Sequence, residues 1–479
     1  MALTLVMSAH NFASRLVPRE CLPLPVPDAA ASERWGGLPL SRSVVRRLQR
    51  SQHREAWLSL GVQAINDMFA GPGSFSVDCL KASTSQHECL RRLRVAYGSV
   101  PPPERLQSAR EAYNELQGCL PGYSSSEVGA LAAFREGHVA LPPVGSAPVP
   151  LLTELGRKDL LFLDNPSRVL LNDLGVQEKL SQSGLKEPYI DPVLKHSRKK
   201  YSSFVCELFR RGVVKFGREC KAKVGAFFVL KKNSDLRLIF DTRMSNCHFQ
   251  KPPNTDLMGP QSLADLYCQQ DDFYLGQGDI RNAFYLCGVP DWLQSYFCLP
   301  AISVRHLDAA TRAALGCSEN DLLFPQVAVL PMGWTWATYF CQKAVDNILI
   351  SKAHHPAHRQ IIGRRPPAPL SKESPSFIVY IDNFAHLGLD EQAVKQATLA
   401  SEVQLRAEGF EVHEVSYTGK GETCQFLGVN IGSDGIIRNT GRRIWRIRLC
   451  LEFLLETNRC TGKELERIIG HLTFMFLLR

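Results

Sequence analysis

The chain of 479 residues is predicted to fold as an α+β protein, and three features of the sequence support this. From about residue 200 onward, short apolar runs typical of strands recur, as at 224–232 and 273–280. Helical patterns lie between them without the regular alternation that builds a parallel sheet. Two of the apolar runs stop at an aspartate, which predicts carboxylates at strand ends.

The N-terminal part is expected to contain a linker and a helical region. Residues 1–40 include a stretch rich in Pro, Ala and Ser and are expected to be disordered. Residues 41–190 are expected to be mostly helical, with a Pro-rich break near 141–150. The first expected helix carries a basic face that either contacts nucleic acid or is simply solvated. This face is formed by Arg46, Arg47, Arg50 and Arg54.

The composition is that of a globular protein, and the sign of its net charge suits a polyanionic partner. Hydrophobic residues make up 44% and charged residues 22% of the chain, which allows a sizeable core. The formal net charge of +9 suits nucleic acid. The 15 cysteines lack zinc-site spacing, so we expect free thiols in a reducing intracellular compartment, the cytoplasm or the nucleus. No run approaches the roughly 20 apolar residues that span a bilayer, so no membrane is expected as a partner.

Two strand-end carboxylates are the candidate catalytic residues. Asp279 closes the apolar run 273–280, and Asp382 interrupts the run 377–384, which predicts a hairpin with a carboxylate at its tip. Such carboxylates can converge at one sheet edge and hold two Mg²⁺ ions about 4 Å apart for phosphoryl transfer. A single aspartate at a strand end is more often a turn residue, so the hypothesis depends on the neighbouring segments.

Two further segments fit the same chemistry. Residues 229–246 predict a hairpin with a basic tip, where Lys231 or Lys232 and Arg237 could close over a triphosphate. The segment V-L-P-M-G-W-T-W-A from residue 329 predicts a bend into a helix, where Gly333 lets a base pair approach the backbone. Alone, either segment could be an ordinary turn.

In this order the segments resemble the reverse transcriptases of retroviruses and LTR-type retrotransposons, over about residues 200–479. K-K-x4-R-x3-D-x-R-x2-N matches the fingers, D-x3-A-F the first palm motif, V-L-P-x-G-W the template-nucleotide loop and Y-x-D the catalytic hairpin. Phe426, Leu427 and Gly428 match the F-L-G primer grip. The resemblance implies a right-hand polymerase, with fingers and an antiparallel palm sheet in residues 197–440 and a partial helical thumb in residues 441–479.

The resemblance also implies an activity and roles for individual residues. The activity is RNA-directed DNA polymerisation, with an RNA or DNA template, a primer, dNTPs and two Mg²⁺ or Mn²⁺ ions. The implied roles are metal binding by Asp279, Asp382 and the carbonyl of Ile280; nucleotide binding by Lys231, Lys232, Arg237, Ala283, Met332 and Gly333; a steric gate at Phe284; primer binding by Phe426, Leu427 and Gly428; and contacts to duplex phosphates by Arg442, Arg443, Arg446 and Arg448.

The catalytic hairpin departs from the family pattern at one position. It reads Y-I-D-N in place of Y-x-D-D, and Asn383 cannot supply the charge of a second carboxylate. The family's lysine before the primer grip is not at its usual spacing, and Lys420 and His413 are the nearest substitutes. Two hypotheses stay open: a retrotransposon-derived polymerase with reduced activity, favoured by the retained aspartates, or an inactive relic that binds nucleic acid as a scaffold.

Overall fold

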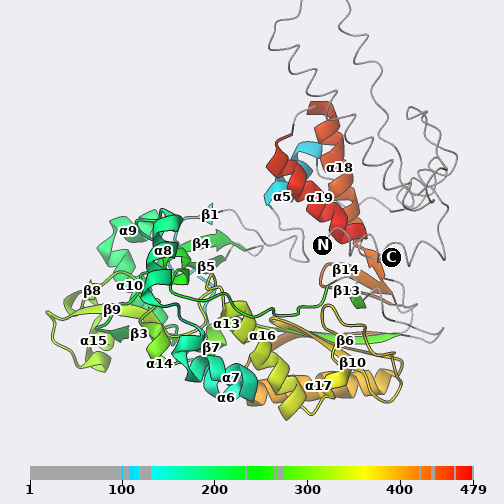
Figure 1. Ribbon diagram of the computed structural model, residues 1–479, viewed down its shortest axis with the longest axis horizontal. Coiled ribbons are helices and arrows are strands. Elements are labelled where there is room, and N and C mark those ends of the chain that lie inside the picture. The colour runs from blue at the N-terminus through cyan, green and yellow to red at the C-terminus, as the bar shows by residue number, and fades with distance from the viewer. Residues whose placement is uncertain are drawn as a thin grey trace, which may run out of the picture. The chain divides into compact units, whose positions relative to one another are not determined.

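The computed structural model describes residues 100, 108–118, 131–231, 235–259, 262–263, 266, 273–419, 422–432, 437–457 and 460–476. The chain divides into two compact units, Met1–Leu106 and Gln107–Arg479, and apart from residue 100 the described residues belong to the second (Figure 1). The expected linker and the expected basic face at Arg46, Arg47, Arg50 and Arg54 lie outside the described residues.

The described part is a mixture of helices and mainly antiparallel sheets, in agreement with the predicted α+β class. Its strands are β1 (Leu131–Ala132), β2 (Val149–Pro150), β3 (Val214–Gly217), β4 (Gly225–Leu230), β5 (Leu236–Asp241), β6 (Tyr274–Ile280), β7 (Cys287–Gly288), β8 (Ile302–Ser303), β9 (Leu322–Val327), β10 (Ser376–Tyr380), β11 (Asn383–Gly388), β12 (Val412–Thr418), β13 (Thr423–Phe426), β14 (Val429–Gly432) and β15 (Ile437–Asn439). Antiparallel sheets have the orders β1-β4-β5, β3-β9-β8, β10-β11-β6-β12 and β13-β14-β15, whereas β2 and β7 pair in parallel.

Some of the helices pack against the sheets, and three others pack against one another. They are α5 (Ala109–Gly118), α6 (Leu151–Glu154), α7 (Arg157–Asp164), η1 (Pro166–Arg168), α8 (Asp173–Ser183), α9 (Pro192–His196), α10 (Arg198–Arg210), α11 (Arg243–Asn246), α13 (Ala283–Leu286), α14 (Asp291–Gln294), η2 (Val304–His306), α15 (Ala309–Leu315), α16 (Ala337–Asn347), η3 (Ile348–Lys352), η4 (Ala357–Arg359), α17 (Glu391–Ala407), α18 (Gly441–Thr457) and α19 (Gly462–Phe476). Within the described residues, no helix is long and apolar enough to cross a lipid bilayer.

The sheet β10-β11-β6-β12 is called the central sheet below; β10 and β11 are buried on both faces, whereas the edge strand β12 is partly exposed. Successive side chains of a strand point to opposite faces, so Phe377 and Val379 join one hydrophobic cluster while Ile378 joins the other. Helices α16 and α17 contact its strands (Figure 1). Gly276 allows α17 to come close, because a Cβ there would lie 2.2 Å from Oγ1 of Thr398. Burial on both faces explains why β10 and β11 read as nearly continuous apolar runs.

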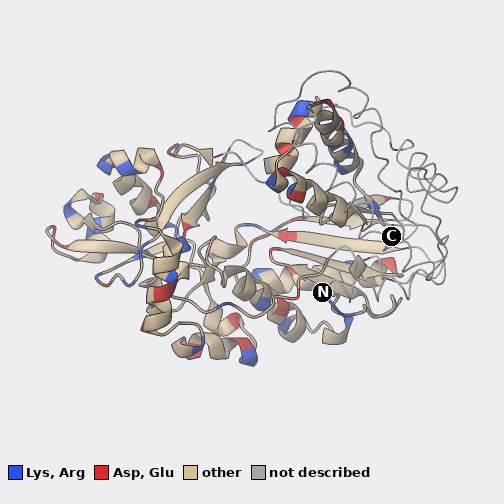
Figure 2. Ribbon diagram, turned by 45° about the horizontal axis from the view of Figure 1, so that its top comes forward, with Lys and Arg blue, Asp and Glu red and all other residues tan. Residues whose placement is uncertain are grey.

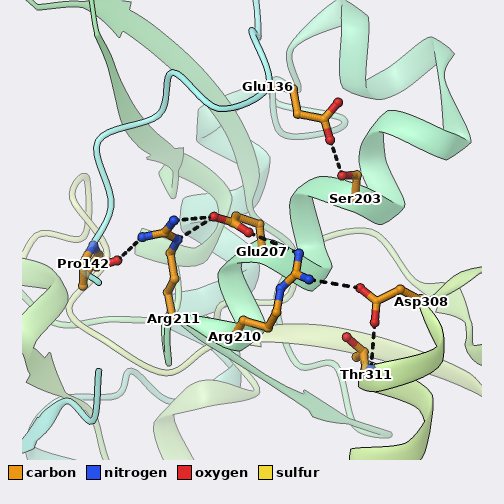
Figure 3. A network of polar contacts seen from close by, with 8 residues as sticks. All are labelled: Glu136, Pro142, Ser203, Glu207, Arg210, Arg211, Asp308 and Thr311. Atoms are coloured by element: carbon orange, nitrogen blue, oxygen red, sulfur yellow. Dashed lines mark hydrogen bonds and ion pairs between the residues drawn. The ribbon is translucent and has the colours of Figure 1, made fainter. Parts of the chain in front are cut away.

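Polar contacts tie residues 131–142 to α10 (Figure 3). Strand β1 pairs with β4, which extends the β4–β5 hairpin. Glu136 accepts a hydrogen bond from Ser203, and Arg211 donates to the carbonyl of Pro142. This stretch of the expected helical region therefore belongs to the β4–β5 sheet. The network continues through Glu207, Arg210, Asp308 and Thr311.

Helix α5 packs against α18 and α19, and the three are called the helical unit below (Figure 1). Ala112 and Leu116 of α5 are fully buried. The ring centroids of Tyr113 and Phe453 lie 4.7 Å apart. A capping box at Thr461 begins α19, because its amide donates to the Glu464 carboxylate at 2.7 Å and its hydroxyl accepts from the Glu464 amide at 3.3 Å.

Candidate active site

A two-residue turn joins β10 to β11 and carries Asp382. Tyr380 pairs with Asn383, so Ile381 and Asp382 form the tip, and the predicted hairpin is confirmed. Ile381 has a φ of 61°, a left-handed conformation that costs a β-branched residue about 1–3 kcal/mol. A positive φ at the first tip residue is the type II′ pattern, which normally uses glycine there. The turn is therefore strained, and the surrounding structure must hold it.

Asp279 lies on β6, and Asp382 lies in the turn directly before β11, the neighbouring strand of the same antiparallel sheet. Asp279 is the cross-strand partner of Asn383, the residue directly after Asp382. The amide of Ile280 donates to the carbonyl of Asp382 at 2.7 Å, which fastens the turn to β6. Directly opposed residues of antiparallel strands have Cα atoms roughly 4.5–5.5 Å apart. The sheet thus brings together two aspartates that are distant in sequence, while the metal-binding role of the Ile280 carbonyl stays a prediction.

Two further side chains complete this end of the sheet. Asn383 donates from Nδ2 to Oδ1 of Asp382 at 2.9 Å, so it occupies a lone pair of the carboxylate. On the other side, β12 pairs His413 with Asp279 and places its Nδ1 3.1 Å from Oδ2, outside hydrogen-bond geometry. Asp279, Asp382, Asn383 and His413 are called the carboxylate edge below.

The carboxylate edge is only partly exposed. The side chains of Asp279 and His413 are 30% and 28% accessible, respectively. Burial, and secondarily the negative charge of Asp382, raises the pKa of Tyr380 beside the turn. Solvent can therefore reach Asp279, whereas Tyr380 beside the turn is partly buried.

The donor set of the carboxylate edge suits divalent cations that are held weakly. No group of three or more His, Cys, Asp or Glu side chains within the described residues is arranged to hold a metal ion. Two carboxylates do offer the hard oxygen donors that Mg²⁺ and Mn²⁺ prefer. Mg²⁺ is commonly bound through one or two carboxylates together with substrate phosphates. Asp279 and Asp382 would fit such ions as oxygen donors, with one negative charge fewer than a three-carboxylate site would supply.

The loop at residues 331–335 is clamped to β5 and α11. The amide of Phe240 donates to the carbonyl of Met332 at 3.2 Å. Asn246 donates to the carbonyl of Gly333 at 3.0 Å and accepts from the amide of Thr335 at 3.1 Å. Gly333 has a φ of 122°, and a Cβ there would lie 2.5 Å from the Phe240 carbonyl oxygen. The fold itself therefore requires this glycine, and approach of a base pair to it stays a prediction.

Apart from Met332 and Gly333, the expected nucleotide-binding residues that the structure describes lie on or beside β4–β5 and α13. Arg237 is on β5, opposite Val229, and Lys231 directly follows β4, whereas Lys232 lies outside the described residues. Phe284 is half-buried and Ala283 is buried in the short helix that follows the Asp279 strand. The neighbouring Tyr285 donates its hydroxyl to the Leu238 carbonyl at 2.8 Å, which ties α13 to β5. Nucleotide binding by these residues stays a prediction.

The F-L-G segment forms the turn between β13 and β14. Phe426 pairs with Val429 and is buried in the second hydrophobic cluster. Leu427 and Gly428 have φ values of 47° and 78°, the pattern of a type I′ turn. This sheet is linked to the central sheet by Gln277, which contacts the carbonyl of Gln425 at 3.4 Å. Primer binding by the turn stays a prediction.

The four arginines of α18 do not share one environment. Arg442 and Arg448 have exposed side chains, whereas Arg443 and Arg446 are only 3% and 5% accessible. The guanidinium of Arg443 lies 3.9 Å from the ring centroid of Phe474, and Arg446 pairs with Glu115 at 2.7 Å. Residues three apart share a helix face, and here that face is buried. The expectation of phosphate contacts therefore does not suit Arg443 and Arg446, because they pack inside the helical unit.

Charge alone does not single out a binding face in the described chain. Figure 2 shows Lys and Arg positions interspersed with Asp and Glu positions on the helices, those of the helical unit included. Both Arg442 and Arg446 approach Glu115, at 3.3 and 2.7 Å. A run of arginines in the sequence thus contributes to internal ion pairs as well as to the surface.

Comparison with known proteins finds distant likenesses among solved structures. No family model and no curated protein matches the chain. Two structures of the foamy viral protease-reverse transcriptase with double-stranded DNA are 14% identical, with TM-scores of 0.40 and 0.41; each match covers 78% of this chain. A mutant prototype foamy virus protease-reverse transcriptase is 16% identical over 53% of this chain, with a TM-score of 0.34. The matches span 54%, 64% and 27% of those chains, respectively. Likenesses this distant leave function to be argued from the residues of this chain.

Sequence reasoning missed a set of polar residues directly behind the turn. Gln342 of α16 is buried, and its Oε1 accepts from the amide of Ile381 at 2.7 Å. Asp346, one turn further along α16, is also buried, and burial raises its pKa. The available signal was a glutamine and an aspartate four residues apart on the apolar side of a helix.

Proposed function

We propose that this chain is a template-directed nucleotidyl transferase of the reverse-transcriptase type, derived from a retrotransposon, which extends a primer on an RNA or DNA template. The observation that carries the proposal is the position of Asp279, on β6, beside Asp382, in the turn that leads into the neighbouring strand β11. Each aspartate ends or interrupts a buried apolar strand, and the order of the motifs along the chain agrees with the polymerase pattern.

In this proposal each region has a part of the right-hand polymerase. The central sheet is the palm, the β4–β5 hairpin belongs to the fingers, and the helical unit is the thumb. Arg237, together with Lys231 or Lys232, binds the incoming triphosphate. Phe284, in the helix after Asp279, excludes a ribose 2′-hydroxyl.

The carboxylate edge supplies the chemistry of the proposed reaction. When bound, two divalent ions would activate the attacking 3′-hydroxyl and stabilise the pyrophosphate leaving group. Asp279 and Asp382 would hold these ions. Asn383 orients Asp382 by donating a hydrogen bond of 2.9 Å to its Oδ1. A cation that binds Oδ1 would have to displace this hydrogen bond or share the oxygen with it. Because the edge lacks one negative charge, we expect weak activity with Mg²⁺ and better activity with Mn²⁺, which tolerates less regular coordination.

A second candidate is a scaffold that binds nucleic acid without catalysis. The hydrogen bond from Asn383 to Asp382 favours it, since an amide donor partly satisfies the carboxylate without any cation. The two candidates share a fold and differ only in the chemistry at the carboxylate edge.

Primer extension by the purified chain distinguishes the two candidates. Wild type and Asp382→Asn are compared on a primed RNA template in Mg²⁺ and in Mn²⁺, with duplex binding measured in parallel. The enzyme predicts extension by wild type and a loss on the order of a thousandfold in Asp382→Asn, equivalent to several kcal/mol of transition-state stabilisation. Duplex binding without extension by wild type in either metal supports the scaffold instead. Equal extension by both proteins shows that the activity does not use Asp382.

A further inference from the structure

A buried network of hydrogen bonds lies directly behind the strained turn. Gln342 uses both ends of its side-chain amide there: Oε1 accepts from the Ile381 amide at 2.7 Å, and Nε2 donates to the carbonyl of Val379 at 3.1 Å. Nε2 also donates to Oδ1 of Asp346 at 2.9 Å. One side chain therefore bridges the end of β10, the tip of the turn and helix α16.

Asp346 fixes which way the Gln342 amide faces. Its Oδ1 also accepts from Nε2 of Gln360 at 2.7 Å, and Nζ of Lys343 lies 3.3 Å from its Oδ2. Two donors besides Gln342, namely Gln360 and Lys343, thus converge on this carboxylate. An inverted amide would direct an oxygen at Oδ1 of Asp346 and an NH₂ group at the N–H of Ile381. Both contacts would then be lost in a buried place, so the observed orientation is strongly preferred.

We propose that Gln342 and Asp346 are positioning residues that hold Ile381 in its left-handed conformation and thereby fix the place of the Asp382 carboxylate. The turn has two tip residues, and each is fastened from a different side. Gln342 binds the amide of Ile381 from behind, and the amide of Ile280 binds the carbonyl of Asp382 from β6. Without the first contact, the strain at Ile381 favours a different turn, and Asp382 moves relative to Asp279.

The hydrogen bond itself can be tested without any catalysis. We expect Gln342→Ala to speed hydrogen exchange of the Ile381 amide by about tenfold or more, the effect of losing one buried hydrogen bond. Asp346→Ala should act in the same direction, because the Gln342 amide is then free to invert. Gln294→Ala is the matched control, since Gln294 is likewise buried and donates to a carbonyl and to an aspartate on its own helix, Asp291. Unchanged exchange at Ile381 in Gln342→Ala would overturn the proposal.

A rescue experiment tests whether the network acts through the turn. The kinetic part rests on the proposed function. Gln342→Ala should lower kcat by about tenfold and leave KM for the dNTP within about twofold. Glycine adopts a positive φ without strain, so in the Ile381→Gly background the same substitution should lower kcat by less than about threefold. An equal loss in both backgrounds would make Gln342 a general packing residue and overturn the proposal.

Failure of the positioning role can be told apart from failure of the proposed function. If wild type extends no primer in Mg²⁺ or Mn²⁺, the polymerase proposal fails, while the exchange of the Ile381 amide still decides whether Gln342 holds the turn. If wild type extends a primer and the exchange is unaffected by Gln342→Ala, the polymerase proposal stands and the positioning role is overturned.

Discussion

The carboxylate edge and the helical unit treat charged side chains in opposite ways. Both bring together residues that are far apart in the sequence. At the carboxylate edge, Asp279 and His413 keep about a third of their side-chain surface accessible. In the helical unit, Arg443 and Arg446 are almost completely buried, against Phe474 and Glu115. The difference teaches that a charged side chain indicates a binding site only where the fold leaves it accessible to solvent. In α18, for example, Arg442 is exposed, whereas Arg443 packs in the interior of the helical unit.

The largest expected effect tests the structural use of charge in the helical unit. Glu115→Ala should lower the free energy of unfolding by about 3 kcal/mol, because Arg446 would lose its carboxylate partner in a buried place. Arg442→Ala is the control: its exposed side chain also approaches Glu115, and its removal should cost less than about 0.5 kcal/mol. Urea denaturation measures both. Equal costs would mean that burial does not separate the two arginines.

The next effect tests whether an aromatic side chain near the carboxylate edge faces substrate. Phe284→Ala should weaken discrimination against ribonucleotides on the order of a hundredfold, because the ring no longer fills the space of a 2′-hydroxyl. Incorporation of each sugar is compared by single-nucleotide extension. Tyr285→Phe, which alters the neighbouring buried residue without emptying that space, should leave discrimination unchanged. Unaltered discrimination in Phe284→Ala would make Phe284 a core residue.

A smaller effect tests the missing charge at the carboxylate edge. Asn383→Asp should raise primer extension in Mg²⁺ by about tenfold, since it adds a negative charge beside the cations and removes the donor that occupies Asp382. The gain should be smaller in Mn²⁺. A loss of activity in both metals would show that Asn383 is needed as a donor to Asp382.

The smallest effect concerns pH and the helix side of the central sheet. His355 and His386 both contact the hydroxyl of Ser401, at 2.7 and 2.8 Å. Burial lowers the pKa of His355 to about 4 and that of His386 well below its usual value. Between about pH 6.5 and pH 4 the unfolded chain therefore binds more protons than the folded chain. The contribution of these neutral histidines to the free energy of unfolding should be fully present above about pH 6.5 and be lost as the pH falls. For His355 we expect a loss of about 1 kcal/mol, which allows for its partial exposure.

Thermal melts at pH 7 and pH 5 measure this loss. His355→Asn should reduce the difference in Tm between the two pH values, whereas substitution of the exposed His358 by Asn should not. An identical acid shift in wild type and His355→Asn would assign the effect to other groups.

The central sheet was the most predictable part of the molecule. The β10–β11 hairpin is buried on both faces and β6 is mostly buried, so their apolar runs are easily recognised and the carboxylates that end them stand out. The start of α19 at Thr461 can also be recognised from the sequence, because a capping box is formed by two residues only three positions apart.

Other features depend on contacts that no local pattern contains. The burial of Arg443 follows from packing against Phe474, and that of Arg446 from a pair with Glu115, far away in the sequence. The role of Gln342 depends on the left-handed conformation of Ile381, which the sequence gives no reason to expect from a β-branched residue. Long-range pairing and strain were therefore beyond sequence patterns.

The placement of α5 and β1 limits the distance between the helical unit and the β4–β5 hairpin. Helix α5 ends at Gly118 in the helical unit, and β1 begins at Leu131, beside β4. A chain advances at most about 3.6 Å per residue, so the thirteen steps from Gly118 to Leu131 can span no more than about 47 Å. The covalent connection therefore sets a maximum distance between the helical unit and the β4–β5 hairpin. Any wider separation would require α5 to leave α18 or β1 to leave β4.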